Sequence, residues 1–169
     1  MGQYHVTANL SKKEFVHPHA LGDGLKLIEQ AGSGPGGIGT ALILLLAASN
    51  GYGGGDFDVE DSNEVVGRWA GDQVAIVGDY AEPEDLAPEH EAELVYDLCG
   101  TQKEVAEQAA HLANYAKNSV QPEYAGRAAR LQSTEPYADI TPLVRSYLEK
   151  EGVAMYGDGS GRISRTLSH

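Results

Sequence analysis

Cysteine is almost absent from this sequence of 169 residues, in which Cys99 is the only one. A single cysteine excludes an intrachain disulfide, and it excludes any zinc site built from several cysteines. Cys99 comes at the end of an apolar, helix-like segment. We therefore expect a buried and unreactive thiol there, with a catalytic nucleophile as the lesser alternative.

Long apolar runs are also absent. The longest runs from residue 38 to residue 48 and is interrupted by Gly39 and Thr40, so it falls well short of the ~20 residues that span a bilayer. The chain does not open with a basic segment followed by an apolar one, so no secretory signal is expected. These absences predict a cytoplasmic protein, or one of the virion or host cytoplasm if a virus encodes it.

Basic residues are scarce: 12 lysines and arginines stand against 25 aspartates and glutamates, which gives a net charge of −13. Such a balance argues against nucleic acid as a partner, because that binding depends on neutralising phosphates with Lys and Arg. It argues equally against an anionic membrane surface. Three interpretations stay open, namely solubility through self-repulsion, a basic partner, and adaptation to the salty cytoplasm of a halophilic host.

The N-terminal half reads as strands and short helices. Alternating apolar side chains predict a half-buried strand over residues 4–9, and a second strand follows over residues 14–17. A short helix is expected after Asp23, with Leu27 and Ile28 facing the interior. A helix over residues 38–49 is apolar nearly all round, which is typical of a buried central helix.

Two apolar stretches separated by Gly71-Asp72 predict a hairpin near residues 65–78, with Trp69 in the core. The rest of the chain reads as helical. Three helices are expected there: one from about residue 84 or 88 to Cys99, one over 102–119 that begins with a capping box, and one from Thr141 to about 152.

Together these elements predict one α+β domain over residues 1–156 and a flexible tail over 157–169. The domain would hold a small antiparallel sheet, made of the N-terminal strands and the hairpin. The buried apolar helix and the helical C-terminal half would pack against that sheet.

Five Gly-Asp steps recur along the chain. They are Gly22-Asp23, Gly55-Asp56, Gly71-Asp72, Gly78-Asp79 and Gly157-Asp158. Glycine reaches positive φ without strain and aspartate bonds its own backbone, so we interpret the steps first as turns. Asp72 and Asp79 bracket the expected hairpin and form a weak candidate for a general acid–base pair.

The glycine-rich loop before the apolar helix suggests an anion site. Its candidate residues are Gly34, Gly37, Gly39 and Thr40. A helix N-terminus attracts anions through its unpaired amides. However, a dinucleotide fingerprint needs a strand before the loop, and a Walker motif needs a lysine where Thr40 stands. A connector between two helices is the competing interpretation.

His17 and His19 flank Pro18 and form the best metal candidate, with Asp23 as a further ligand. Neutral imidazoles and a carboxylate suit zinc or a related divalent ion. A strand end whose histidines bond the backbone or face solvent is the competing interpretation, because the His-x-His pattern is common.

The first half of the chain resembles a group of short bacterial, archaeal and phage proteins to which no activity is attached. The shared residues are Met1-Gly2-Gln3-Tyr4, Asn9-Leu10, Lys13-Glu14, Pro18-His19, Gly22-Asp23-Gly24, Lys26-Leu27, Gly54-Gly55-Asp56, Trp69-Ala70-Gly71-Asp72 and Gly78-Asp79-Tyr80. The resemblance implies a shared fold and implies nothing catalytic.

No complete catalytic constellation emerges, so the leading hypothesis is a non-enzymatic binding or assembly protein without a cofactor. Its partner would be another protein or a second copy of itself. The alternative is a metal-dependent hydrolase that uses His17, His19 and Asp23, with Asp72 or Asp79 as general base. A phosphate or small-molecule sensor at the loop over residues 32–39 is the third hypothesis.

Overall fold

The computed structural model describes residues 2–48, 63–119 and 121–151. The predicted tail over residues 157–169 lies outside the described residues, as do the Gly55-Asp56 and Gly157-Asp158 steps. The described part is α+β, as predicted.

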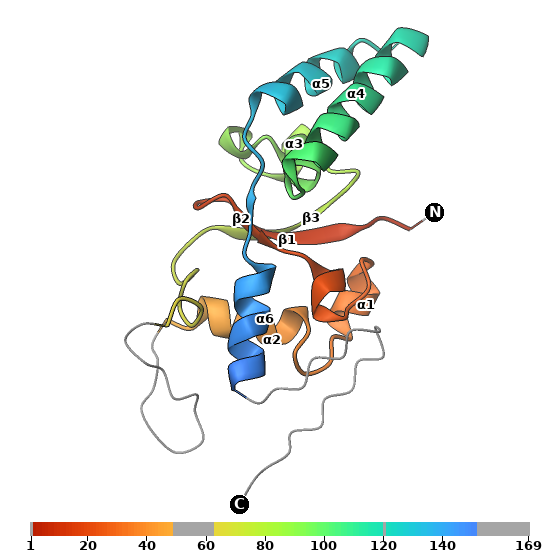
Figure 1. Ribbon diagram of the computed structural model, residues 1–169. Coiled ribbons are helices and arrows are strands. Elements are labelled where there is room, and N and C mark those ends of the chain that lie inside the picture. The colour runs from red at the N-terminus through yellow and green to blue at the C-terminus, as the bar shows by residue number, and fades with distance from the viewer. Residues whose placement is uncertain (1, 49–62, 120, 152–169) are drawn as a thin grey trace, which may run out of the picture.

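A four-stranded sheet crosses the middle of the molecule (Figure 1). Its strands are β1 (His5–Asn9), β2 (Glu14–Val16), β3 (Val74–Gly78) and β4 (Ala138–Asp139), in the order β3-β1-β2-β4. β1 pairs antiparallel with both β2 and β3, so that Thr7 lies opposite Val16 on one side and opposite Ile76 on the other. β4 runs parallel to β2, which makes the sheet mixed where the sequence predicted an antiparallel one.

Within the described residues, six α-helices cover the two faces of the sheet. α3 (Ala92–Leu98), α4 (Gln102–Asn118) and α5 (Glu123–Ser133) lie on one side of it, above the sheet in Figure 1. α1 (Leu27–Ala31), α2 (Ile38–Leu46) and α6 (Thr141–Lys150) lie on the other side. The chain thus folds as three layers with the sheet in the middle.

The alternation of side chains along the strands divides the interior into two cores. Val6, Ala8 and Phe15 belong to the core beneath α3, α4 and α5. Val16 points to the opposite face and joins the second core, which includes side chains of α2 and α6. Because both faces are covered, every residue of β1 is buried, including the polar ones. The half-buried strand predicted from the alternation is therefore wrong.

The predicted hairpin near residues 65–78 is formed only in its second half, as β3. Its first half folds as turns against the C-terminal end of α2, where the amides of Gly67 and Trp69 donate to the carbonyls of Leu44 and Leu45. These bonds satisfy carbonyls that a helix end leaves free, so they compete with strand pairing. Trp69 is fully buried in the second core, as predicted.

The two early helices bury less apolar surface than predicted. The exposed fractions of Leu27 and Ile28 on α1 are 49% and 78%, so the expected inward face is wrong. α1 instead buries Gln30, whose amide donates to the carbonyls of His5 and Leu25. α2 is buried on one side only, since the exposed fraction of Ile43 is 74%.

The later helices match the sequence more closely. α4 begins at the predicted capping box, in which Thr101 and Glu104 bond each other's backbone amides. α6 begins at Thr141, and Ile140 is its N-cap. α5, which packs along α4, was not predicted.

No described helix combines the length and the apolar composition that crossing a membrane requires.

Candidate functional site

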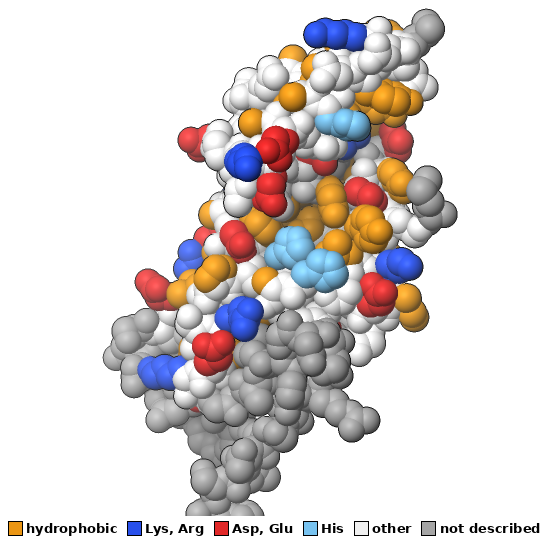
Figure 2. Space-filling view, turned by 45° about the vertical axis from the view of Figure 1, so that its right-hand side comes forward, with side chains coloured by type: hydrophobic (Ala, Val, Ile, Leu, Met, Phe, Trp, Pro, Cys, Tyr) orange, Lys and Arg blue, Asp and Glu red, His pale blue; other side chains and the backbone are white. Residues whose placement is uncertain are grey.

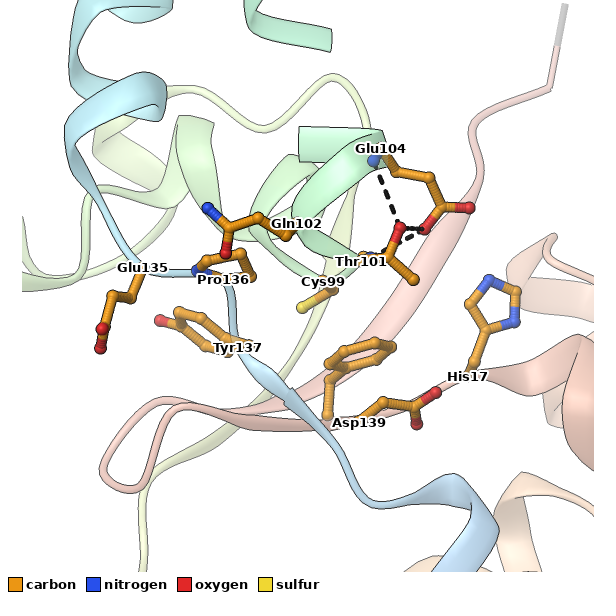
Figure 3. A pocket seen from close by; sticks show the side chains of 11 residues that line it. His17, Cys99, Thr101, Gln102, Glu104, Glu135, Pro136, Tyr137 and Asp139 are labelled. Carbon is orange, nitrogen blue, oxygen red and sulfur yellow. Dashed lines mark hydrogen bonds between the residues drawn. The ribbon is translucent and has the colours of Figure 1, made fainter. Parts of the chain in front are cut away.

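A cavity of about 680 Å³ opens between the N-terminus of α4 and the β2–β4 edge of the sheet (Figure 3). His17 comes from the end of β2, and Asp139 comes from β4. Thr101 and Glu104 come from the start of α4, and Tyr137 comes from the segment that links α5 to β4. The fold thus brings residues from both halves of the chain to one opening.

Glu104 is held at the rim of the cavity by Thr101. The amide and the hydroxyl of Thr101 both donate to the Glu104 carboxylate, at 2.8 Å each. These two bonds lower the pKa of Glu104. Because hydrogen bonds to a carboxylate favour its charged form, Glu104 presents a negative charge at neutral pH.

Asp139 positions the end of β2 through Thr141. The Asp139 carboxylate accepts a hydrogen bond from the Thr141 amide at 2.9 Å and another from its hydroxyl. The same hydroxyl oxygen accepts the His17 amide at 2.8 Å. Since Thr141 is buried, this chain of bonds fixes His17 beside Asp139.

His17 is the one histidine that lines the cavity, and it lies beside His19. Their ring centroids are 5.9 Å apart. The face drawn in Figure 2 carries two adjacent histidine side chains next to hydrophobic ones. Burial lowers the pKa of His17, and His19 lowers it further, whereas Asp139 and Glu104 act in the opposite direction. The net decrease leaves the imidazole neutral at pH 7.

Cys99 and Tyr137 form the inner part of the cavity (Figure 3). Cys99 is buried, as predicted, and this burial raises the pKa of its thiol, as do Asp139 and Asp97. Because the thiolate is the reactive form, the thiol is a poor nucleophile. Burial also raises the pKa of Tyr137 to about 12, with smaller contributions from Cys99 and Glu91, so the phenol stays protonated.

The charge around the cavity has one sign. Glu104, Glu135 and Asp139 line it, and no lysine or arginine does. None of these three carboxylates takes part in the ion pairs found between described residues. With His17 neutral, the opening is suited to a cationic group such as an amine or a guanidinium.

No protein-family model matches this chain, and no curated protein or solved structure matches it either.

The predicted metal ligands are only partly brought together. His17 and His19 are neighbours, and Nδ1 of His19 lies 2.9 Å from the backbone carbonyl of Asp23. The Asp23 carboxylate, however, accepts the Ile38 amide at 2.6 Å and the Ser33 hydroxyl at 2.7 Å. Among the residues that the structure describes, no three His, Cys, Asp or Glu side chains are placed as a set of metal ligands.

The predicted anion-binding residues Gly34, Gly37, Gly39 and Thr40 lie at the N-terminus of α2. Amides of this loop already have acceptors within the chain, since Gly36 donates to the Thr40 hydroxyl at 2.7 Å and Gly37 donates to the Gly34 carbonyl. Asp23 supplies the negative charge that a helix N-terminus favours. An external phosphate would compete with this carboxylate, and the sensor hypothesis stays a prediction.

Asp72 and Asp79 lie just outside the two ends of β3. Because a strand rises about 3.3 Å per residue, roughly 20 Å separates the two residues. Asp72 accepts Asn9 Nδ2 at 2.8 Å and forms an ion pair with Lys12 at 3.0 Å. Asp79 accepts the Tyr4 amide at 3.0 Å. The geometry does not bring the two carboxylates together as an acid–base pair.

Proposed function

We propose that this chain is a small acidic binding protein without catalytic activity, and that it receives a basic side chain of a partner protein in the cavity beside His17. The observation that supports this proposal is the lining of the cavity, in which every residue charged at neutral pH is a carboxylate. Such a site favours a guanidinium, because Arg forms paired hydrogen bonds with carboxylates and stacks on aromatic rings. Tyr137 supplies an aromatic ring inside the cavity.

The net charge of −13 supports the same partner chemistry at longer range. A strongly acidic protein attracts basic partners and speeds their association, and salt weakens this effect. The cavity would then select the side chain that is buried on contact. Binding by this mechanism needs no cofactor.

Calorimetry with a short blocked peptide that contains one arginine tests the proposal. The matched peptide carries citrulline, which is neutral but has the same shape. We expect binding of the arginine peptide only, and we expect Glu104→Gln to weaken it about threefold to fivefold, the usual worth of one partly exposed charge pair. Glutamine also completes a capping box, so this substitution preserves the start of α4.

Glu107→Gln is the matched control, because Glu107 lies on the same helix, is exposed, pairs with Lys103 and does not line the cavity. It removes the same charge, so it should weaken binding only by the small amount that a change of one unit in net charge causes. Equal binding of the arginine and citrulline peptides would contradict the proposal. Equal weakening by Glu104→Gln and Glu107→Gln would contradict it as well.

A metal-dependent hydrolase is the second candidate, because the bond between His19 Nδ1 and the Asp23 carbonyl leaves Nε2 of His19 available beside His17. This hypothesis predicts one equivalent of zinc in protein purified without chelator or affinity tag. Elemental analysis would detect it, and the double variant His17→Ala, His19→Ala should lose it while keeping its circular dichroism spectrum. Metal content that is the same in both proteins would rule out these ligands.

A further inference from the structure

β3 is an end strand of the sheet, and only one of its edges is paired among the described residues. The amide of Asp79 donates to the Tyr4 carbonyl, and the amide of Leu10 donates to the Gln73 carbonyl. In an antiparallel pair these bonds recur at every second residue. Residues 75 and 77 therefore bond β1, whereas the backbone groups of Val74, Ile76 and Gly78 point away from the sheet. Of these groups, the Gly78 carbonyl already accepts the Ala81 amide.

The middle of this open edge is apolar and accessible. The exposed fraction of Ile76 is 48%, although Ile76 lies at the centre of a strand. A smaller cavity of about 190 Å³ is lined by residues 76–78 of β3 together with Gln3, His5, Ala81, Asp85 and Leu86. The open edge therefore has both free backbone groups and a hollow that a side chain can enter. An exposed strand edge of this kind is a template for pairing with another chain.

The charges next to this edge decide which kind of chain fits it. Asp79, Glu82, Glu84 and Asp85 follow β3 within seven positions, and no lysine or arginine lies among them. A second copy paired antiparallel through its own β3 would place the two acidic segments at opposite ends of the ladder, and residues 74–78 of that copy carry no basic side chain to meet them. A segment with basic side chains would meet opposite charges instead.

We propose that the open edge of β3 binds an extended segment of a partner protein in which apolar and basic side chains alternate. The segment would add a strand next to β3 by bonding the outward amides and carbonyls of Val74 and Ile76 and the outward amide of Gly78. Its apolar side chains would cover Ile76, and its basic side chains would lie near Asp79 and Asp85. This surface is separate from the cavity beside His17, and the inference does not depend on that cavity.

Amide hydrogen exchange, measured by NMR, tests this inference with a short blocked peptide of alternating valine and lysine. We expect the peptide to slow exchange at the amides of Ile76 and Gly78. The matched peptide, in which glutamate replaces lysine, should leave these amides unchanged. Protection by both peptides alike, or by neither, would overturn the inference.

Variants at position 76 locate the binding edge. Ile76→Pro removes an amide that points away from β1, so it leaves the β1–β3 bonds intact, and it should weaken binding of the valine–lysine peptide by about tenfold. Ile76→Lys should weaken it as well, because a charge on an edge strand opposes pairing. This second variant keeps the test decisive if the proline variant does not fold.

Ile43→Lys is the control for Ile76→Lys, because Ile43 is also an exposed isoleucine but lies on α2. Both substitutions change the net charge equally. Affinity that falls only in Ile76→Lys supports the β3 edge, and affinity that falls equally in both variants overturns it. Circular dichroism melting confirms that each variant is folded before binding is measured.

Discussion

Replacement of Glu14 by alanine is expected to lower the free energy of unfolding by about 3 kcal/mol, because it leaves two buried or half-buried donors without their acceptor. Glu14 is buried on β2. Its carboxylate accepts Arg68 Nε at 3.0 Å and Arg68 Nη2 at 2.6 Å, and it accepts Trp69 Nε1 at 2.8 Å. The indole of Trp69 is fully buried, so its N–H would lose the acceptor that the native fold provides.

Urea denaturation followed by tryptophan fluorescence would measure this loss. Glu14→Gln should cost less than Glu14→Ala, since a glutamine oxygen can still accept the Trp69 indole N–H. Glu107→Ala, at an exposed glutamate with a weak ion pair, is the control and should change stability by less than about 1 kcal/mol. A change in Glu14→Ala no larger than in this control would contradict the account of the network.

The same network predicts a dependence of stability on pH. Burial alone would raise the pKa of Glu14, but the hydrogen bonds from Arg68 and Trp69 and the charges of Arg68 and Lys12 outweigh burial and lower the pKa from its ordinary value of 4.5. The stabilisation is therefore complete above pH 4.5 and is lost as the pH falls through the lower pKa of the folded state. Glu14→Gln should lack this part of the acid sensitivity.

The second large effect is expected at the N-terminus of α2. Asp23→Ala should cost about 2 to 3 kcal/mol, because it removes the acceptor of the buried Ile38 amide and of the Ser33 hydroxyl. Gly37→Ala should also be destabilising, because a Cβ at position 37 would collide with the Asp23 carboxylate and the Ser33 hydroxyl.

Gly39→Ala provides the matched control. A Cβ there would lie 3.8 Å from Ser33, which is an ordinary contact. Because alanine favours a helix over glycine, this variant should be neutral or more stable by up to about 1 kcal/mol. Thermal melting tests these expectations: Asp23→Ala and Gly37→Ala should lower the melting temperature, and Gly39→Ala should not. Equal effects of Gly37→Ala and Gly39→Ala would show that the carboxylate does not fill the space next to Gly37.

Elements defined by local signals were predictable from the sequence. β1 and β2 follow from alternation and from Pro18, and α4 follows from the capping box that begins at Thr101. The first strand of the expected hairpin failed because long-range bonds to the end of α2 satisfy the backbone of Gly67 and Trp69. α5 was missed because Gly126 interrupts a weakly apolar segment, and its pairing with α4 is a tertiary effect.

The candidate cavity was predicted only in part. His17 was singled out for its spacing from His19, and Glu104 was singled out for its place in the capping box. No sequence pattern near His17 or near Glu104 indicates that these two residues line the same cavity. The segment that ends in β4 connects their surroundings: the Tyr137 amide donates to the Leu98 carbonyl shortly before α4, and β4, which is two residues long, pairs with β2. A strand that short gives no periodic signal.

The central claim is that the cavity beside His17 receives a basic side chain. NMR chemical-shift mapping with the arginine peptide, compared with the citrulline peptide, tests it most directly. The arginine peptide alone is expected to shift the amides of Thr101, Gln102 and Tyr137, which line the cavity. Unchanged amides at these three positions, or shifts confined to other parts of the described chain, would contradict it.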